Sequence, residues 1–279
     1  CIRDSAWIAG PQTTLLANKV NALSAGGSFV MTIPKSPYRC PPGPYERACL
    51  VADILKRKGG GTVTVLDAND GIQAEAHTFS KAFNELYGDI IDYQTNVAIA
   101  SVGYEKEKDF KDFVETGSGK ISGDVVNIIA PQRALGFVRE AGLTGGGDWA
   151  GVDPLTYQST VPDFEKVHII GDSQGSGQPK SAHMASSQAK VCADAIIRIL
   201  ADLPIDSEER VKNITTNSAC YSPITYDEAS WLTANFKYDV ELGQMVLARR
   251  PLGEADHWSK DNYEEMFAWA SNLFTDSFH

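Results

Sequence analysis

The feature that most constrains the fold is a strand–helix–strand pattern in the first quarter of the chain. Ser28–Ile33 is a short apolar run, Pro44–Lys58 repeats its apolar residues at helical spacing, and Thr62–Asp67 is rich in β-branched residues. Two strands joined by a helix lie parallel in one sheet, and helices cover the faces of such a sheet. The sequence therefore predicts an α/β fold built on a parallel sheet.

The rest of the chain adds helices and strands to this unit. Residues 77–119 give mixed signals and no detailed prediction. Beyond them the chain reads as a second α/β segment followed by a small α+β tail. The further elements that we expect are helices over 4–25, from Lys180-Ser181 to about Leu200 and over 260–274, and strands over 125–130, 166–171 and 245–248.

The composition excludes several classes of protein. The 279 residues include 36 acidic and 25 basic side chains, so the formal net charge is −11. A surface of this sign repels phosphate backbones, which argues against a nucleic-acid partner and leaves either a basic protein partner or a solvated acidic face. No uncharged apolar run approaches the roughly 18 residues of a membrane span, so we expect no membrane span.

The turn after the first strand is unlike a dinucleotide site. A domain that binds NAD places G-x-G-x-x-G there, because backbone N–H groups must approach the pyrophosphate. Here the segment from Pro34 to Pro44 contains several prolines, which lack that N–H group. We therefore expect an NAD-like architecture that binds no NAD.

The five cysteines form no CxxC pair, and the five histidines show no metal-ligand spacing, so we expect no metal site. Cys40 precedes the helix that begins near Pro44, and the positive end of that helix favours a thiolate. The residue is either a nucleophile or an inert member of a proline-rich turn. Glu46 is either a general base or a favourable charge in the first helical turn. By local pattern, Cys49, Cys192 and Cys220 read as core residues.

A Gly171-Asp172 pair ends the apolar run 166–171, and a helix begins shortly afterwards. A carboxylate beside a helix N-terminus suits a cofactor that carries hydroxyl groups and negative charge. The same pair also forms ordinary turns.

At several points the sequence resembles the flavoprotein subunit of flavocytochrome c sulfide dehydrogenase. The distinctive segment is Tyr38-Arg39-Cys40-Pro41-Pro42-Gly43-Pro44-Tyr45-Glu46-Arg47-Ala48. The resemblance extends over nearly the whole chain. Its other matching residues are Trp7, Ala9-Gly10, Gln12-Thr13, Asn127, Pro131-Gln132-Arg133-Ala134, Gly171-Asp172, Pro179-Lys180-Ser181, Ser187-Gln188, Lys190-Val191, Cys220-Tyr221-Ser222, Trp258 and Asp276-Ser277-Phe278.

The resemblance implies a glutathione-reductase-like protein that oxidises sulfide and passes electrons through FAD to a c-type cytochrome subunit. Cys40 and Cys220 would be its redox-active disulfide, with Glu46 as the acidic group beside them. Asp172 at Gly171 would hold the ribityl chain of FAD. The helix start at Lys180 and Ser181 would face the pyrimidine end of the flavin.

The family also implies a domain plan and a location. We expect a connector helix over 1–25, an NAD-like domain over 26–112, the second part of an FAD domain over 113–204 and an interface domain over 205–279. Family members begin with a strand, a G-x-G-x-x-G turn and a cysteine that attaches FAD, none of which stands in this sequence, so we expect the isolated chain to bind little FAD.

The sequence departs from the family pattern at His183, Ser173 and Ala219. The location that the family implies is the periplasm. The alternative is a non-catalytic or truncated homologue that docks a cytochrome or serves as a structural domain.

Overall fold

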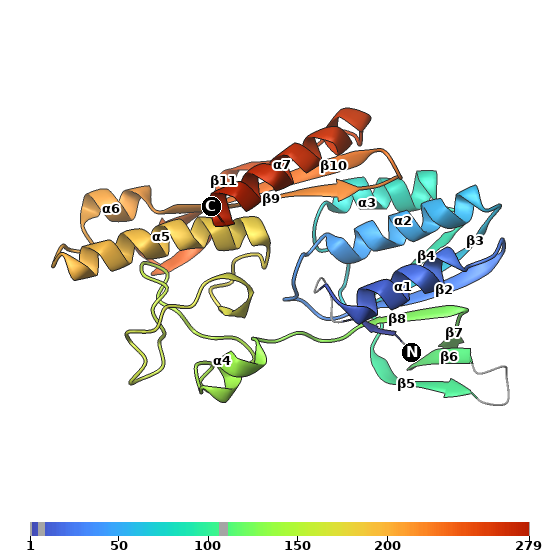
Figure 1. The fold of residues 1–279 in the computed structure, drawn as a ribbon, viewed down its shortest axis with the longest axis horizontal. Coiled ribbons are helices and arrows are strands. Elements are labelled where there is room, and N and C mark those ends of the chain that lie inside the picture. The colour runs from blue at the N-terminus through green and yellow to red at the C-terminus, as the bar shows by residue number, and fades with distance from the viewer. Residues whose placement is uncertain (1, 5–8, 106–110, 279) are drawn as a thin grey trace. The chain divides into compact units, whose positions relative to one another are not determined.

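The computed structural model describes residues 2–4, 9–105 and 111–278, so that Cys1 and Trp7 lie outside the described residues. The chain divides into two compact units (Figure 1). The first unit consists of residues 1–131, 222–230 and 255–263, and the second unit consists of residues 132–221, 231–254 and 264–279. This division by compactness does not test the four-part domain plan, which stays a prediction.

The first unit is built on a sheet of five strands that are all parallel. This confirms the α/β prediction and its parallel sheet. The strands follow the order β1, β8, β2, β3, β4. Their bounds are β1 (Ile2–Asp4), β2 (Gly27–Ile33), β3 (Gly61–Asp67), β4 (Ile91–Gln94) and β8 (Val125–Ile129).

Helices cover one face of this sheet and a small antiparallel sheet covers the other (Figure 1). Alternate residues of β2 explain the two layers, because successive side chains of a strand point to opposite faces. Phe29 and Met31 join the core under the helices, whereas Val30 joins the core shared with the antiparallel strands. The covering elements are α1 (Pro11–Asn21), α2 (Gly43–Arg57), α3 (Ala76–Lys81), the π-helical turn η1 (Ala82–Leu86), β5 (Ile99–Glu105), β6 (Lys111–Thr116) and β7 (Gly119–Ser122).

The first helix is shorter than predicted. We expected it over 4–25, but α1 begins at Pro11 and ends at Asn21, and residues 5–8 lie outside the described residues. Pro11 suits the first helical position because its missing N–H would have no partner there. Residues 77–119, which gave no detailed prediction, contain two short helical turns and short strands.

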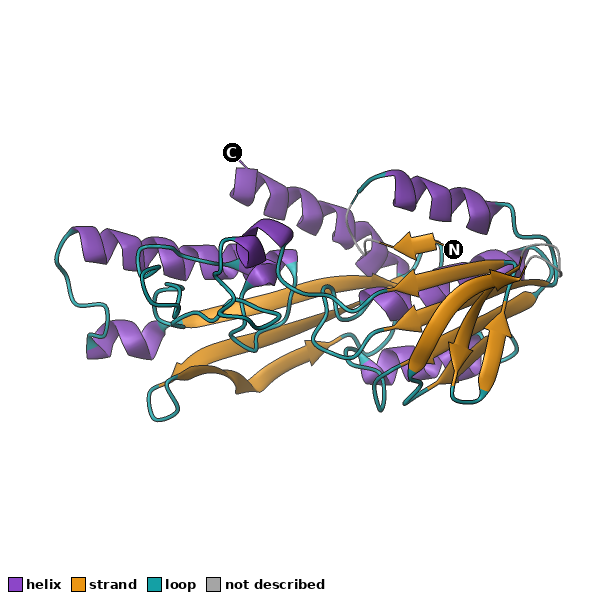
Figure 2. Cartoon of the chain, turned by 90° about the horizontal axis from the view of Figure 1, so that it is seen from below, coloured by secondary structure: helices purple, strands orange, loops and turns teal. Residues whose placement is uncertain are grey.

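The second unit contains two long helices and most of a three-stranded antiparallel sheet with the order β11, β10, β9. Most of residues 141–181 form loops, drawn in teal in Figure 2. The last residues of β9 and the first residues of β10 and α7 are assigned to the first unit. The elements are α4 (Gly136–Glu140), the 3-10 turn η2 (Gly171–Ser173), α5 (Ala182–Leu200), α6 (Glu208–Asn213), β9 (Thr215–Pro223), β10 (Ala229–Asp239), β11 (Gln244–Glu254) and α7 (Lys260–Phe278).

The strand predicted over 166–171 is wrong. Only an isolated bridge between His168 and Gln158 forms there, and Gly171 turns the chain with a φ of 72°. The apolar run that suggested a strand instead packs Ile169 into a local core with Ala134 and Val138. Ile169 is therefore buried, but among the described residues the segment has no neighbouring strand to pair with.

Among the described residues, no helix combines the length and the apolar character that crossing a membrane requires.

Candidate functional site

Cys40 lies in the turn between β2 and α2. Its backbone adopts the left-handed conformation, with a φ of 51°, and the residue is half-buried. The carbonyl oxygen of Cys40 accepts a hydrogen bond of 2.9 Å from the N–H of Gly43, where α2 begins. The turn therefore fixes the cysteine immediately before the positive end of a 15-residue helix, as the sequence predicted.

Glu46 lies in the first turn of α2 and meets a residue from far along the chain. The Ser222 hydroxyl donates to Glu46 Oε1 at 3.1 Å and also contacts the Glu75 carboxylate. Burial raises the pKa of Glu46 to about 8, and the charge of Glu75 adds to this effect. The bond from Ser222 and the charge of Arg47 oppose it. A carboxyl group with such a pKa can both take and release a proton near neutral pH.

The carboxylate at the end of β3 is held inside the protein. Asp67 is fully buried, and its Oδ2 accepts hydrogen bonds from the hydroxyls of Tyr45 at 2.9 Å and Tyr93 at 2.8 Å. Its Oδ1 accepts a bond from the Asn69 side chain at 2.7 Å. In dinucleotide-binding domains, an acidic residue of this region contacts a ribose. Here protein donors occupy it, in keeping with the proline-rich turn.

Cys49 and Cys192 are core residues, as predicted. Cys49 has no exposed surface and packs in the core under the helices, and burial raises the pKa of its thiol. Burial also raises the pKa of the Cys192 thiol, whose sulfur lies 3.5 Å from Nδ1 of His168. Neither thiol ionises readily, so neither is a good nucleophile.

In the second unit, Gly171 and Asp172 form a tight turn at the start of α5. The Gly171 N–H donates to Gln188 Oε1 at 2.8 Å. A Cβ at position 171 would lie 3.4 Å from the Cβ of Ala185 on α5, so a glycine suits both the left-handed φ and the close approach. The half-buried Asp172 is thus fixed at the N-terminal part of the helix.

Lys180 is buried, and its ammonium group binds backbone oxygens of the same turn. The Nζ atom donates to the carbonyl oxygens of Asp172 at 2.9 Å and Gln174 at 2.6 Å. It also lies 3.7 Å from the centre of the Trp149 ring. Burial lowers the pKa of Lys180 to about 8, against the charge of Asp172, which raises it. Lys180 therefore holds the turn in place.

Ser181 caps α5. Its hydroxyl oxygen accepts a bond from the N–H of Met184 at 3.1 Å and lies 2.8 Å from the hydroxyl of Ser218. The cap satisfies one of the N–H groups that a helix start leaves without an intrahelical partner. The sequence identified the helix start correctly, and the structure adds a structural role for its serine.

Cys220 lies in β9, where its neighbours contact α5 and α7. The N–H of Ala219 donates to Nδ1 of His183 at 3.0 Å, and the ring of Tyr221 lies 5.6 Å from that of Trp269. Burial lowers the pKa of His183, and the charge of Lys190 adds to this effect. The imidazole is therefore held neutral with its proton on Nε2. Cys40 and Cys220 belong to different units, and their pairing stays a prediction.

The sequence analysis missed Glu75 and the contact that Ser222 makes with it. Glu75 is buried, with a φ of 49°, directly before α3. No motif marks it, because the contact between Ser222 and Glu75 joins residues 147 positions apart. A left-handed acidic residue has no sequence signature of its own.

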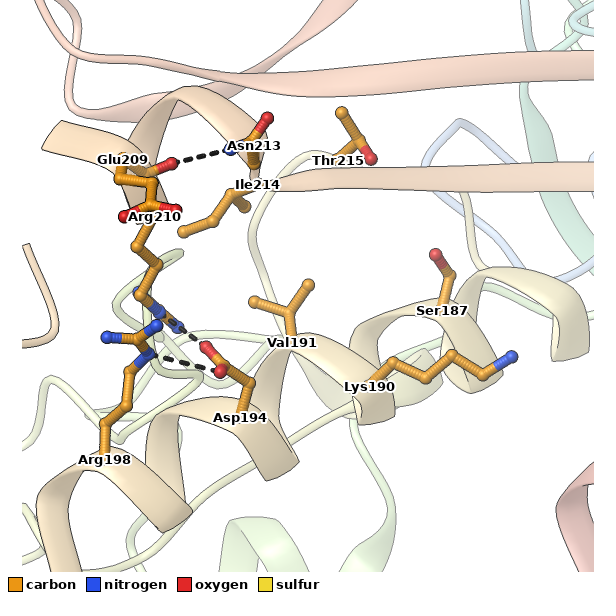
Figure 3. A pocket seen from close by; sticks show the side chains of 10 residues that line it. All are labelled: Ser187, Lys190, Val191, Asp194, Arg198, Glu209, Arg210, Asn213, Ile214 and Thr215. Carbon is orange, nitrogen blue, oxygen red and sulfur yellow. Dashed lines mark hydrogen bonds and ion pairs between the residues drawn. The ribbon is translucent and has the colours of Figure 1, made fainter. Parts of the chain in front are cut away.

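A cavity of about 430 Å³ opens between α5 and α6 in the second unit (Figure 3). Its charged walls pair with each other: Asp194 accepts bonds from Arg210 at 2.6 Å and from Arg198 at 3.2 Å. Arg210 also binds the carbonyl oxygens of Ile205 and Leu155. These bonds tie α6 to α5 and to a loop, so we assign the cavity no ligand.

The residues around the Gly171-Asp172 turn fit the ribityl end of a flavin. Asp172 supplies a carboxylate that can accept hydrogen bonds from hydroxyl groups near the start of α5. In the part of the chain that the structure describes, the buried Nε2 of Gln174 has no hydrogen-bond partner, so an acceptor on a bound group would satisfy it. The described residues contain no cluster of three or more His, Cys, Asp or Glu that could hold a metal ion.

Comparison with known proteins finds a family model that matches one segment of the chain. Residues 13–130 match the model of the central domain of the sulfide dehydrogenase [flavocytochrome c] flavoprotein chain. The match includes Cys40 and Glu46 and confirms the resemblance on which the sequence analysis relied.

Solved structures confirm the fold. A chain of the covalent putidaredoxin reductase–putidaredoxin complex is 14% identical with a TM-score of 0.51, over 95% of this chain and 62% of that one. The ferredoxin reductase for the CYP199A2 system of Rhodopseudomonas palustris is 15% identical, with a TM-score of 0.50, over 80% and 50%. A chain of the mitochondrial ATP synthase of Tetrahymena thermophila is 16% identical, with a TM-score of 0.58, over 82% and 54%.

The chain thus spans between half and three-fifths of the length of these solved chains. The likeness to the reductases among them bears out the glutathione-reductase-like fold.

Proposed function

We propose that this chain is part of a sulfide-oxidising flavoprotein, in which electrons pass from sulfide through a Cys40–Cys220 disulfide and FAD to a c-type cytochrome subunit. The observation that carries the proposal is the match of residues 13–130 to the sulfide dehydrogenase flavoprotein chain, because it contains both Cys40 and Glu46. The protein would work in the periplasm, an oxidising compartment where a disulfide persists.

One contact in the first unit supports a role for the cysteine pair. Cys40 directly precedes α2, and Glu46 on the first turn of α2 is bonded to Ser222. Ser222 follows Cys220 by two residues on β9. Each cysteine is therefore close in sequence to one end of the Glu46–Ser222 hydrogen bond.

The proposed chemistry begins with hydrosulfide, HS⁻, attacking one sulfur of the disulfide. A new S–S bond forms to the sulfide sulfur, the old S–S bond breaks, and its electron pair leaves on the other cysteine as a thiolate. Sulfide is oxidised and one cysteine is reduced. Where H₂S is the attacking species, its proton passes to the carboxylate of Glu46, the general base.

FAD, when bound, would supply the acceptor for the two electrons that the thiolate gives up. Asp172 would hold its ribityl hydroxyls, with Gly171 giving the close turn. The α5 N-terminus at Ser181 would place positive dipole character toward the flavin. Lys180 contributes by fixing the turn that carries Asp172, through the two carbonyl oxygens that it binds.

The test uses the longest natural form of the protein that purifies with flavin. Sulfide should bleach the flavin absorbance, and Cys40→Ser or Cys220→Ser should reduce the rate by at least about 10³-fold, because no covalent sulfur intermediate can form. Cys192→Ala is the matched control, since Cys192 lies in the core, and it should retain bleaching. A bound flavin that sulfide does not bleach in the unsubstituted protein would overturn the enzymatic proposal in favour of a docking or structural domain.

The disulfide has its own test. When the chain is unfolded without reduction, thiol titration should find three thiols among the five cysteines. Five thiols would contradict the bridge.

A further inference from the structure

The hydroxyl group of Ser222 lies between two carboxyl groups. It contacts Oε1 of Glu46 at 3.1 Å and Oε2 of Glu75 more closely still. Ser222 has no exposed surface and Glu75 is buried. Glu46 comes from α2, Glu75 precedes α3 and Ser222 is on β9, so the fold brings three separate segments to one point.

Counting hydrogens shows what this arrangement requires. A serine hydroxyl has a single proton and can donate it to one of the two carboxyl groups only. The contact with the other becomes a hydrogen bond only when that carboxyl group is itself protonated and donates to the serine oxygen. Two buried carboxylates of like charge also repel each other, which favours protonation of one of them.

Some groups around Glu46 and Glu75 raise the pKa of Glu46, and others lower it. Arg47 on α2 favours the charged form of Glu46, while its guanidinium is bonded to Asn127 Oδ1 at 2.7 Å. Cys49 and Asp53 lie on the same helix, and the charges of Asp53 and of both glutamates raise the pKa of the Cys49 thiol. Since burial outweighs Arg47, the pKa of Glu46 is about 8.

We propose that Glu46 and Glu75 share one proton through Ser222, and that this pair exchanges the proton with the sulfur chemistry of the Cys40 turn. The second half of this inference rests on the proposed function. The pair carries one proton and one negative charge, so it takes up the proton of H₂S when the disulfide is attacked and returns a proton when a thiolate leaves. Glu46 exchanges the proton, and Glu75 and Ser222 are positioning residues.

The shared proton can be tested without sulfide or flavin. Difference infrared spectra of the 279-residue chain should show the carbonyl-stretch band of a protonated carboxyl group at pH 7, lost as the pH rises through about 8. Glu46→Gln should remove this band, whereas Glu75→Gln should lower by about one unit the pH at which the band is lost. Both variants should fold because glutamine resembles the protonated acid. Glu241→Gln, in the exposed turn before β11, should leave the band unchanged. Absence of the band in the unsubstituted chain, or a band with an unchanged pH dependence in both glutamine variants, would overturn the inference.

The link to catalysis needs a separate readout. In the flavin-loaded protein, Glu75→Gln removes the like charge beside Glu46, so the midpoint of the pH profile of flavin bleaching should move down by about one unit. A merely structural role for Glu75 would change the rate and leave the midpoint in place. An infrared band with an unmoved midpoint would overturn the catalytic half only. A protein that sulfide does not bleach at any pH would overturn the proposed function, while the infrared result stands by itself.

Discussion

A buried charged group has different surroundings in each of the two units. In the first unit, Glu46 and Glu75 face each other across one serine, and the pKa of Glu46 rises to about 8. In the second unit, Lys180 is buried, and two backbone carbonyl oxygens accept hydrogen bonds from its ammonium group. Burial shifts the pKa of both groups, but the like charge of Glu75 adds to the effect on Glu46, whereas the carbonyl oxygens around Lys180 accept its hydrogen bonds and hold the turn. Of the residues that the sequence predicted as site residues, Glu46 thus suits chemistry and Lys180 suits support.

The largest effect on stability should come from removing Lys180, which holds the Asp172 turn. Lys180→Ala deletes the donor to two backbone carbonyl oxygens and leaves them buried, so we expect a loss of roughly 2–4 kcal/mol in the free energy of unfolding. Urea denaturation measures this. Lys190→Ala, which removes a solvent-exposed lysine from the same region, should have far less effect. Equal effects of the two substitutions would contradict the supporting role of Lys180.

The pH dependence of stability should test the acidic pair. Between pH 4.5 and about 8 the folded chain keeps a proton on Glu46 that the unfolded chain has lost, so its stability falls as the pH rises through this window. We expect a decrease of roughly 1–3 kcal/mol, allowing for relaxation of the pair. Glu46→Gln should flatten the profile and be the more stable protein at pH 9. A profile that is the same with and without Glu46 would show that the pair is ionised in the folded state.

The smallest effect should come from the helix cap beside Lys180. Ser181→Ala removes the acceptor for the Met184 N–H and should cost about 1 kcal/mol of unfolding free energy. Ser207→Ala is a matched control, because Ser207 precedes α6 without a side-chain capping bond, and it should cost only a few tenths of that amount. Thermal denaturation followed by circular dichroism compares them. Two equal changes would mean that the hydroxyl of Ser181 contributes nothing as a cap.

Much of the fold was predictable because it depends on neighbours in the sequence. Three predicted elements agree with the structure to within one residue at each end. They are the strand over 28–33 (β2), the helix over 44–58 (α2) and the strand over 62–67 (β3). Their apolar spacing, their glycines and their prolines act over a few residues. Prediction from apolar spacing failed over 166–171, because a strand also needs a partner strand, and local spacing carries no information about a partner.

Some features of the candidate site were likewise predictable from the sequence, and others were not. The position of Cys40 before a helix, and of Glu46 in its first turn, follows from a proline-rich turn and the helical pattern after it. The meeting of Glu46 with Ser222, 176 residues away, does not. Nor could the sequence show that the Lys180 ammonium turns onto the carbonyl oxygens of its own loop.

By itself, the sequence determined a parallel α/β unit, a cysteine at a helix start and a likeness to sulfide dehydrogenase flavoproteins, because periodicity and motifs are local properties of a chain. Only the tertiary structure decided which buried charges meet like charges and which meet partners. That choice fixes their protonation, since desolvation and Coulomb interactions depend on distances in space rather than on separation along the sequence.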